Sequence, residues 1–441
     1  MESGPIEQLT EQKIEQRRLR KEIFAWTLYD FANTSYSVII VTVVYAIYFK
    51  EYIVGDLTIA LGNWVRNPGD FLWGLGGSLS MAIVALSSPI MGAIADYSNQ
   101  KKRFLLVYTL VCVLAMASLY FLQPGMILRA LLIFIIGNIG FEGALVFYNG
   151  FLPQISTPNN IGKISGYGFA FGYVGSLVSL MIALPFATKA FAANDLSLVR
   201  PTFVLAALFF LVFSMPFFFL VKERVVNVNK SEKNYFKAGY RRTLAILKRL
   251  KEFPEITKFL LAYFIYIDGV NTVIYFSGIF ASSTLGFSVR EVIQFFAIVQ
   301  SSAISGSYVF GYLTDKFGPK KTIMITLVLW IVVTVGAFFT YSAAVFYLVG
   351  LIAGIAMGSS QSASRALMGK LIPDGMEAEF YGFYALMGKF SSILGPVTFG
   401  LVSTLSGNQR LAIISLMFFF VAGLILINRV NEEVTYKKFV L

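Results

Sequence analysis

Long apolar runs separated by short polar stretches dominate the chain. A membrane-spanning helix needs about 20 mainly apolar residues, and windows of that length find twelve such runs. They lie near 24–49, 71–95, 104–122, 127–150, 164–188, 199–221, 257–281, 290–313, 321–340, 343–365, 378–404 and 410–428. The pattern therefore predicts an all-α membrane protein with twelve transmembrane helices.

The runs form two sets of six, which predicts an N-terminal six-helix half (1–221), a cytoplasmic basic connector (222–256) and a C-terminal six-helix half (257–441). Between Lys237 and Lys251 the connector alternates basic residues with leucine and isoleucine. This alternation fits an amphipathic helix on an anionic inner leaflet. A solvated connector fits it equally well.

Composition supports the membrane class and narrows the partners. Of 441 residues, 57% are hydrophobic and 14% charged, against about 25% charged in soluble domains. The net charge of +12 comes mostly from the N-terminus, the even-numbered loops and the C-terminus. This asymmetry predicts that both termini are cytoplasmic, in the inner membrane, so no nucleic-acid partner is needed. The absence of histidine excludes imidazole ligands and relays, and the single Cys112 excludes an intrachain disulfide.

A polar motif occurs in both halves. Asp30–Thr34 in the first span and Asp268–Thr272 in the seventh both have the pattern Asp-x-x-Asn-Thr, whose polar positions share one helix face. An acidic residue in a span costs about 2.5–3.5 kcal/mol on insertion scales, which favours a functional role. The predicted substrate or coupling residues here are Asp30, Asn33, Thr34, Asp268, Asn271 and Thr272.

A second repeat lies in the loops after the second and eighth spans, where Gly-x-x-x-Asp precedes a basic cluster. Further landmarks follow in the same order in both halves, which indicates a parallel duplication. The charged residues of the two loops are Asp96, Lys101, Lys102, Arg103, Asp315, Lys316, Lys320 and Lys321.

Two six-helix halves with this paired loop motif resemble the major facilitator superfamily. Within this superfamily, three stretches resemble the vacuole-effluxer-like (autophagy-related amino-acid effluxer) family: Trp26–Tyr36, Phe147–Pro153 and Ile164–Gly175. By this resemblance the chain is a bacterial-type member of that family. The family is implied to export amino acids from the fungal vacuole, while most bacterial members lack an assigned substrate. The resemblance also implies that spans 1, 4, 7 and 10 line a central cavity. The charged loop residues would latch the halves on the cytoplasmic side and set rate and state population without choosing the substrate.

Other polar residues in the spans complete the candidate site. Asn138, Glu142 and Asn149 share a face of the fourth span, Gln361 and Arg365 lie in the tenth, and Lys389 lies in the eleventh. A neutral polar residue in a span is as often a partner in an interhelical hydrogen bond as it is a substrate contact. Glu142 is the candidate carrier of a coupling ion, with the proton favoured over sodium, and Lys389 the candidate partner of a substrate carboxylate. A permanent ion pair of Glu142 with Lys389 or Arg365 is the structural alternative.

These features favour a monomeric secondary transporter in the lipid bilayer that exports a small amino acid or peptide, coupled to protons, by alternating access. No phosphate-binding Gly-x-x-x-x-Gly-Lys-Ser/Thr motif occurs, so direct use of ATP is not expected. No cofactor is expected either. Two alternatives stay open: a non-transporting sensor or scaffold on a transporter fold, and a transporter of sugars, nucleosides or drugs. The lack of histidine and of a nucleophile–base pair disfavours an enzyme.

Overall fold

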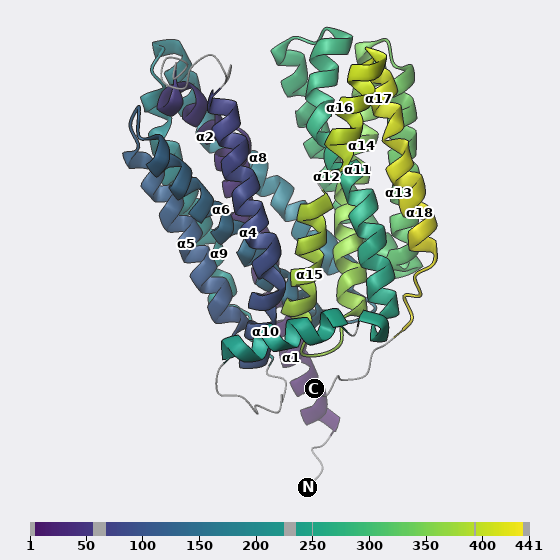
Figure 1. Ribbon diagram of the computed structural model, residues 1–441. Helices are drawn as coiled ribbons and strands as arrows, with labels where there is room; N and C mark the ends of the chain where they lie inside the picture. Colours follow the sequence, from purple (N-terminus) through teal and green to yellow (C-terminus); the bar gives the residue numbers. More distant parts are fainter. Residues whose placement is uncertain (1–4, 56–67, 225–234, 249, 392–393, 435–441) are drawn as a thin grey trace. The chain divides into compact units, whose positions relative to one another are not determined.

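The computed structural model describes residues 5–55, 68–224, 235–248, 250–391 and 394–434. The N-terminal part of the chain is helical throughout its described spans (Figure 1). Its elements are α1 (Pro5–Ser35), the π-helical η1 (Tyr36–Thr42), α2 (Val44–Ile47), the π-helical η2 (Tyr48–Val54), α4 (Pro68–Ser98), α5 (Lys101–Ser118), η3 (Leu119–Phe121), α6 (Ile127–Gly150), α7 (Leu152–Ile155), α8 (Ile161–Ala193), η4 (Leu196–Val199) and α9 (Arg200–Leu220).

The C-terminal part begins with a short helix in the connector and continues with the helices of the second set. They are α10 (Tyr235–Lys248), η5 (Leu250–Glu252), α11 (Pro254–Leu285), α12 (Val289–Phe317), α13 (Pro319–Phe339), α14 (Ala343–Leu371), α15 (Glu377–Phe390), α16 (Leu394–Ser406), α17 (Gln409–Ser415) and α18 (Met417–Asn428). No strand occurs among the described residues.

The number of spans agrees with the sequence pattern. Twelve helical segments of the described chain are long and apolar enough to cross a membrane, so the predicted all-α, twelve-span architecture is confirmed. The first segment begins earlier than predicted, because α1 continues through the charged N-terminal residues from Pro5. Prolines stand inside α4, α8 and α9 without ending them, as membrane helices tolerate when neighbours satisfy the freed backbone groups.

The chain forms two contact units that cut across the sequence halves. The first unit holds 1–80, 102–155 and 174–224, and the second holds 81–101, 156–173 and 225–441. Two segments of the N-terminal half thus pack with the C-terminal helices. The predicted domain boundaries (1–221, 222–256 and 257–441) stay a prediction, and residues 225–234 lie outside the described part.

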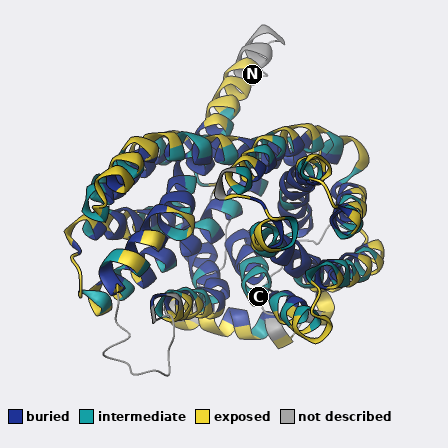
Figure 2. Cartoon of the chain, turned by 90° about the horizontal axis from the view of Figure 1, so that it is seen from above, coloured by how far each residue is buried: buried dark blue, intermediate teal, exposed yellow. Residues whose placement is uncertain are grey.

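Packing within the second unit shows the features of a membrane bundle. Buried positions lie on the helix faces turned toward neighbouring helices, and exposed ones face away from them (Figure 2). A Cβ at Gly354 or Gly358 of α14 would come within 2.9 Å or less of backbone atoms of α12. Such small residues let membrane helices approach closely. Large apolar side chains such as Leu405 and Phe418 are left exposed, as contact with lipid requires.

Candidate functional site

Asp96, near the end of α4, binds the start of α15. Its carboxylate accepts the backbone N–H groups of Ala378 at 3.2 Å and Glu379 at 2.8 Å. The first N–H groups of a helix have no partner inside the helix, and its dipole favours a negative charge there. Asp96 is buried. We call this pairing of Asp96 with Ala378 and Glu379 the Asp96 contact; all its residues belong to the second unit.

Further buried charges surround the Asp96 contact. The Lys101 ammonium lies 3.1 Å from the Asp96 carboxylate and 2.7 Å from that of Glu377. Arg242 donates from Nε to Glu379 at 2.7 Å and from a terminal nitrogen to the carbonyl of Gly375 at 3.0 Å. Removing one partner of such a buried pair leaves an uncompensated charge, which is costly. The network therefore ties the end of α4, the middle of α10 and the start of α15 together.

Arg242 reaches this network because α10 runs across the end of the bundle at which α15 begins (Figure 1). Arg242, Thr243 and Ile246 share its buried face, and the Thr243 hydroxyl donates to the carbonyl of Pro89 in α4 at 3.3 Å. Gly239 lies on the same face, where a Cβ would meet Ile94. The connector therefore does contain a helix, as one of the two interpretations of its sequence predicted. The buried face of this helix packs on protein.

Asp315, near the end of α12, repeats the same geometry. Its two carboxylate oxygens accept the N–H groups of Gly162 at 2.7 Å and Lys163 at 3.0 Å, in the first turn of α8. These residues also belong to the second unit, and we call this pairing the Asp315 contact. The loop aspartates predicted as repeat equivalents therefore make equivalent bonds to helix N-termini.

The remaining basic loop residues make different contacts. Lys102 donates its backbone N–H to Glu223, and Lys320 donates its own to Glu432. Each glutamate follows the sixth span of the same sequence half, and each lysine ammonium donates to a backbone carbonyl there at 2.7 Å. The other basic residues of these loops are exposed: Arg103, Lys316 and Lys321.

The two polar motifs lie in different units. In α1 of the first unit, Asn33 donates its amide to Asp30 at 3.3 Å, and the Thr34 hydroxyl donates to a backbone carbonyl at 3.0 Å. In α11 of the second unit, Asp268 accepts the N–H of Gly395 at 2.7 Å. Thr272 is buried there and Asn271 is half-buried.

The fourth-span candidates are part of the first unit. Asn138 donates to Ser80 at 2.7 Å, Glu142 is 8% exposed, and Asn149 is half-buried. The glycines beside Glu142 make room for the third span, because a Cβ at Gly140 or Gly143 would overlap α5. Glu142 is therefore a buried residue beside the close contact of α6 with α5.

The tenth-span candidates are hydrogen-bonded to residues in the first half of α8. Gln361 accepts the Tyr173 hydroxyl at 2.7 Å, and Arg365 donates to the Ser165 hydroxyl at 3.0 Å and to its carbonyl at 2.7 Å. Gln361 and Arg365 therefore form part of the contact between α8 and α14. Lys389 is half-buried in α15 of the second unit.

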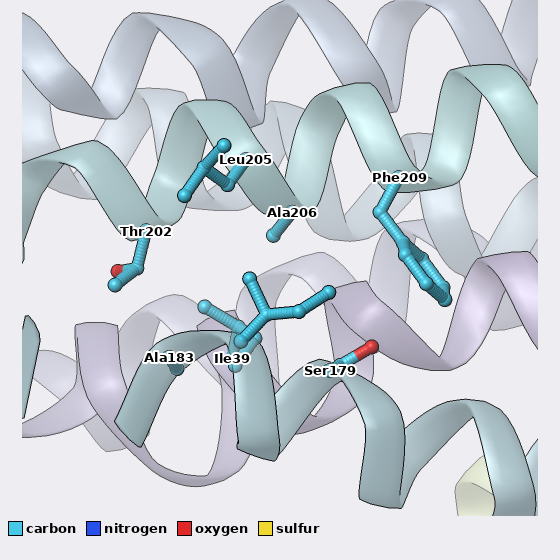
Figure 3. Close-up of a pocket in the computed structure, with 8 residues that line it drawn as sticks. Ile39, Ser179, Ala183, Thr202, Leu205, Ala206 and Phe209 are labelled. Atoms are coloured by element: carbon cyan, nitrogen blue, oxygen red, sulfur yellow. The ribbon is translucent and has the colours of Figure 1, made fainter. Parts of the chain in front are cut away.

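Two hollows differ in their chemistry. In the first unit, a small cavity of about 10 Å³ is lined by apolar side chains of η1, α8 and α9, with hydroxyls of Ser179 and Thr202 at its wall (Figure 3). In the second unit, an open hollow of about 470 Å³ on α12 and α14 carries the hydroxyls of Ser301, Ser302 and Ser305. The second has the size and polarity that suit a small solute.

Sequence reasoning missed Arg242, Glu377 and Glu379. The available signal was a pair of glutamates at the start of the eleventh predicted span, since carboxylates at such a position must be neutralised or hydrated. Arg242 carried no comparable signal, because an arginine in a basic connector is expected at the surface.

Comparison with known proteins agrees with this architecture. Residues 74–438 match the family model described as "Vacuole effluxer Atg22 like". The "Uncharacterized MFS-type transporter YxiO" of Bacillus subtilis (strain 168) is 30% identical over 421 residues, which is 95% of this chain and 96% of that protein. "Autophagy-related protein 22" of Eremothecium gossypii is 23% identical, with 94% and 91% covered.

Solved structures share the fold at low identity. The proton:xylose symporter XylE, of the major facilitator superfamily (MFS), gives a TM-score of 0.74 at 16% identity and covers 94% of this chain and 96% of its own. The MFS transporter FucP, in the outward conformation, gives 0.71 at 14%, with 94% and 98% covered. These similarities confirm the predicted major facilitator fold.

Proposed function

Because this chain belongs to the vacuole effluxer Atg22-like family, whose members are MFS-type transporters and not enzymes, we propose that it exports a small amino acid or peptide with protons. Export is supported by the word effluxer in the family description. The polytopic fold, with twelve candidate spans in the described chain, fits a secondary transporter that works by alternating access.

The Asp96 and Asp315 contacts are the observation that carries this proposal. Each joins a segment of the N-terminal half to a segment of the C-terminal half through bonds from one side chain to a helix N-terminus. Such bonds can break without unfolding either helix, because the N–H groups and the carboxylate can both be hydrated instead. Alternating access needs contacts of this reversible kind on one side of the membrane. In the orientation predicted by the basic residues, that side is cytoplasmic.

Charge chemistry supports a zwitterionic substrate. Glu142 is a buried carboxyl in the fourth span, and Lys389 is a half-buried ammonium in the eleventh. We assign the coupling proton to Glu142 and the substrate carboxylate to Lys389. The serine hydroxyls of the hollow on α12 and α14 offer further partners for a small polar solute.

The function is tested with purified protein. A thermal-shift screen against amino acids, short peptides, sugars and nucleosides identifies a ligand, and counterflow in proteoliposomes then measures its transport. We expect an amino acid or peptide to raise the melting temperature and to exchange across the membrane. A sugar or nucleoside hit supports the other solute class. Binding without counterflow supports a sensor.

The two assigned charges make separable predictions. Glu142→Gln is expected to abolish accumulation driven by a proton gradient but to keep counterflow, because the amide mimics the protonated acid. Lys389→Ala is expected to abolish binding of carboxylate ligands. Accumulation by Glu142→Gln along a proton gradient would contradict the coupling assignment.

A further inference from the structure

Asp268 is a fully buried carboxyl that binds the N-terminus of another helix. It has 0% exposed surface in α11, and its Oδ2 accepts the N–H of Gly395 at 2.7 Å. Gly395 is the second residue of α16, whose first N–H groups have no partner within the helix. One oxygen of Asp268 is therefore held by a helix N-terminus, which favours the ionised form.

The other oxygen has no such support. Among the described residues, neither Asp268 Oδ1 nor the buried hydroxyl of Thr272, one turn along α11, has a hydrogen-bond partner. Both oxygens lie against the same point of α16, since a Cβ on Gly395 would overlap Thr272 Oγ1 and come within 2.8 Å of Asp268 Oδ1. A buried carboxylate oxygen without a donor is costly, and a neutral carboxylic acid avoids most of that cost.

No described cation lies within the ion-pair distance of 4.0 Å from Asp268. The helices α16 and α18 pack on α11 without any titratable side chain. Among the described side chains, the titratable groups on α11 and on the other helices that contact it are Glu255, Lys258, Tyr263, Tyr266 and Tyr275 of α11, Lys251 and Glu252 of η5, Glu291, Tyr308, Tyr312, Asp315 and Lys316 of α12, Lys320 and Lys321 of α13, Tyr347, Arg365 and Lys370 of α14, Glu377, Glu379, Tyr381, Tyr384 and Lys389 of α15, and Arg410 of α17.

The repeat copy provides an internal control. Gly175 of α8 packs on α1 much as Gly395 packs on α11, because a Cβ there would overlap the carbonyl of Phe31 and lie 2.8 Å from Thr34 Oγ1. In that copy, however, Asp30 accepts the amide of Asn33 and the Thr34 hydroxyl donates to the backbone. The packing is shared by both copies, whereas the unpartnered carboxyl oxygen is found at Asp268.

We propose that Asp268 is a proton-binding site, neutral while Gly395 and Thr272 cover it and ionised when water reaches Oδ1. On release, the O–H bond of the acid breaks and the proton passes to water. The Thr272 hydroxyl can serve both forms, as an acceptor for the acid or a donor to the carboxylate. The inference deepens the proposed function, on which it rests for its role in coupling, by adding a second proton carrier in the C-terminal half.

The test uses infrared difference spectra of the whole protein in lipid, titrated from acid to alkaline buffer without substrate. A protonated carboxyl gives a carbonyl band at a higher frequency than the bands of an amide or a carboxylate. We expect the band of Asp268 in the unsubstituted protein at neutral pH. It should disappear completely in Asp268→Asn and persist in the matched variant Asp30→Asn. A spectrum that Asp268→Asn leaves unchanged at every pH overturns the proposal.

A second pair of variants decides the matter where Asp268→Asn does not fold. Thr272→Val removes the hydroxyl that could stabilise the carboxylate, so its band should persist to higher pH, while Thr272→Ser should titrate as the unsubstituted protein does. Equal titration of the two overturns the proposal. Because no substrate is present, a failed transport assay leaves this result unchanged, so failure of the proposed function is distinguished from failure of the proton site.

Discussion

The Asp96 and Asp315 contacts share their geometry and differ in their charge. In both, one aspartate accepts two N–H groups from the first turn of a helix, α15 or α8. The helix after Asp96 begins with Lys101, whereas the helix after Asp315 begins with Pro319. The first contact therefore contains a buried lysine that has no counterpart in the second.

The helices that are bound differ as well. α15 begins with Glu377, which pairs with Lys101, whereas α8 begins with Ile161. The third residue of α15 is Glu379, held by Arg242. The third residue of α8 is Lys163, whose ammonium stands 4.7 Å from the ring centre of Tyr312. A helix-capping aspartate is thus the common part, and the network of buried ion pairs is an addition to one copy.

The difference has a consequence for gating. Opening the Asp315 contact exposes one carboxylate to water, whereas opening the Asp96 contact must rearrange several paired charges together. Buried pairs are costly when one partner is removed and tolerable when both are hydrated. We therefore infer that the Asp96 contact controls the exchange between states more strongly than its repeat copy.

The largest effect is expected for Asp96→Asn, and Asp315→Asn is the variant to compare with it. Asp96→Asn removes one of the two carboxylates that neutralise Lys101 and weakens two bonds to α15, so we expect a loss of about 3 kcal/mol, the lower end of the range for a disrupted buried pair. Asp315→Asn weakens two bonds but disrupts no ion pair, so about 1–3 kcal/mol is expected. Both should shift the protein toward the state in which the contact is open, and both should slow transport.

Pulsed electron paramagnetic resonance checks this ranking. Spin labels at Gln100 and Asp374 report on the Asp96 contact, and labels at Asn159 and Lys321 report on the Asp315 contact, in a Cys112→Ser background. Ligand affinity within one state should change little. Equal shifts for the two variants would show that the buried charges add nothing to the control of the gate.

The next effect concerns Arg242, which only the structure assigns to the Asp96 contact. Arg242→Ala leaves Glu379, with 0% exposed surface, without its ion-pair partner, and we expect a loss of about 3 kcal/mol. Thermal unfolding and the Gln100–Asp374 distance measure it. Lys248→Ala, in the exposed last turn of α10, is the matched control. Adding Glu379→Gln should restore part of the loss, and a strictly additive double variant would rule out the pairing.

The number of spans and the repeated loops were predictable from the sequence because both depend on local patterns. Apolar runs of fixed length identify the spans, and Asp96 and Asp315 stand out because each precedes a basic cluster. The charged network was not predictable, since Arg242 and Glu379 are 137 residues apart and meet only because α10 folds across α15. Gln361 and Arg365 illustrate the same limit: their polarity marked them, but their partners on α8 depend on packing.

The smallest expected effect concerns Lys102 and Lys320, which the family resemblance places among the gating residues. Each donates its ammonium to a backbone carbonyl at the C-terminal end of the sixth span of its own half. Neither bond joins the two sequence halves, so breaking it should not change the balance between states. Lys102→Ala and Lys320→Ala keep the backbone N–H bond to the glutamate and lose only the partly exposed ammonium bond. We therefore expect equal losses of about 1 kcal/mol or less, measured by thermal unfolding, with both label distances unchanged. A change in either label distance would show that these lysines do take part in gating. A change for Lys102→Ala alone would show that the charged network of the Asp96 contact extends along α5.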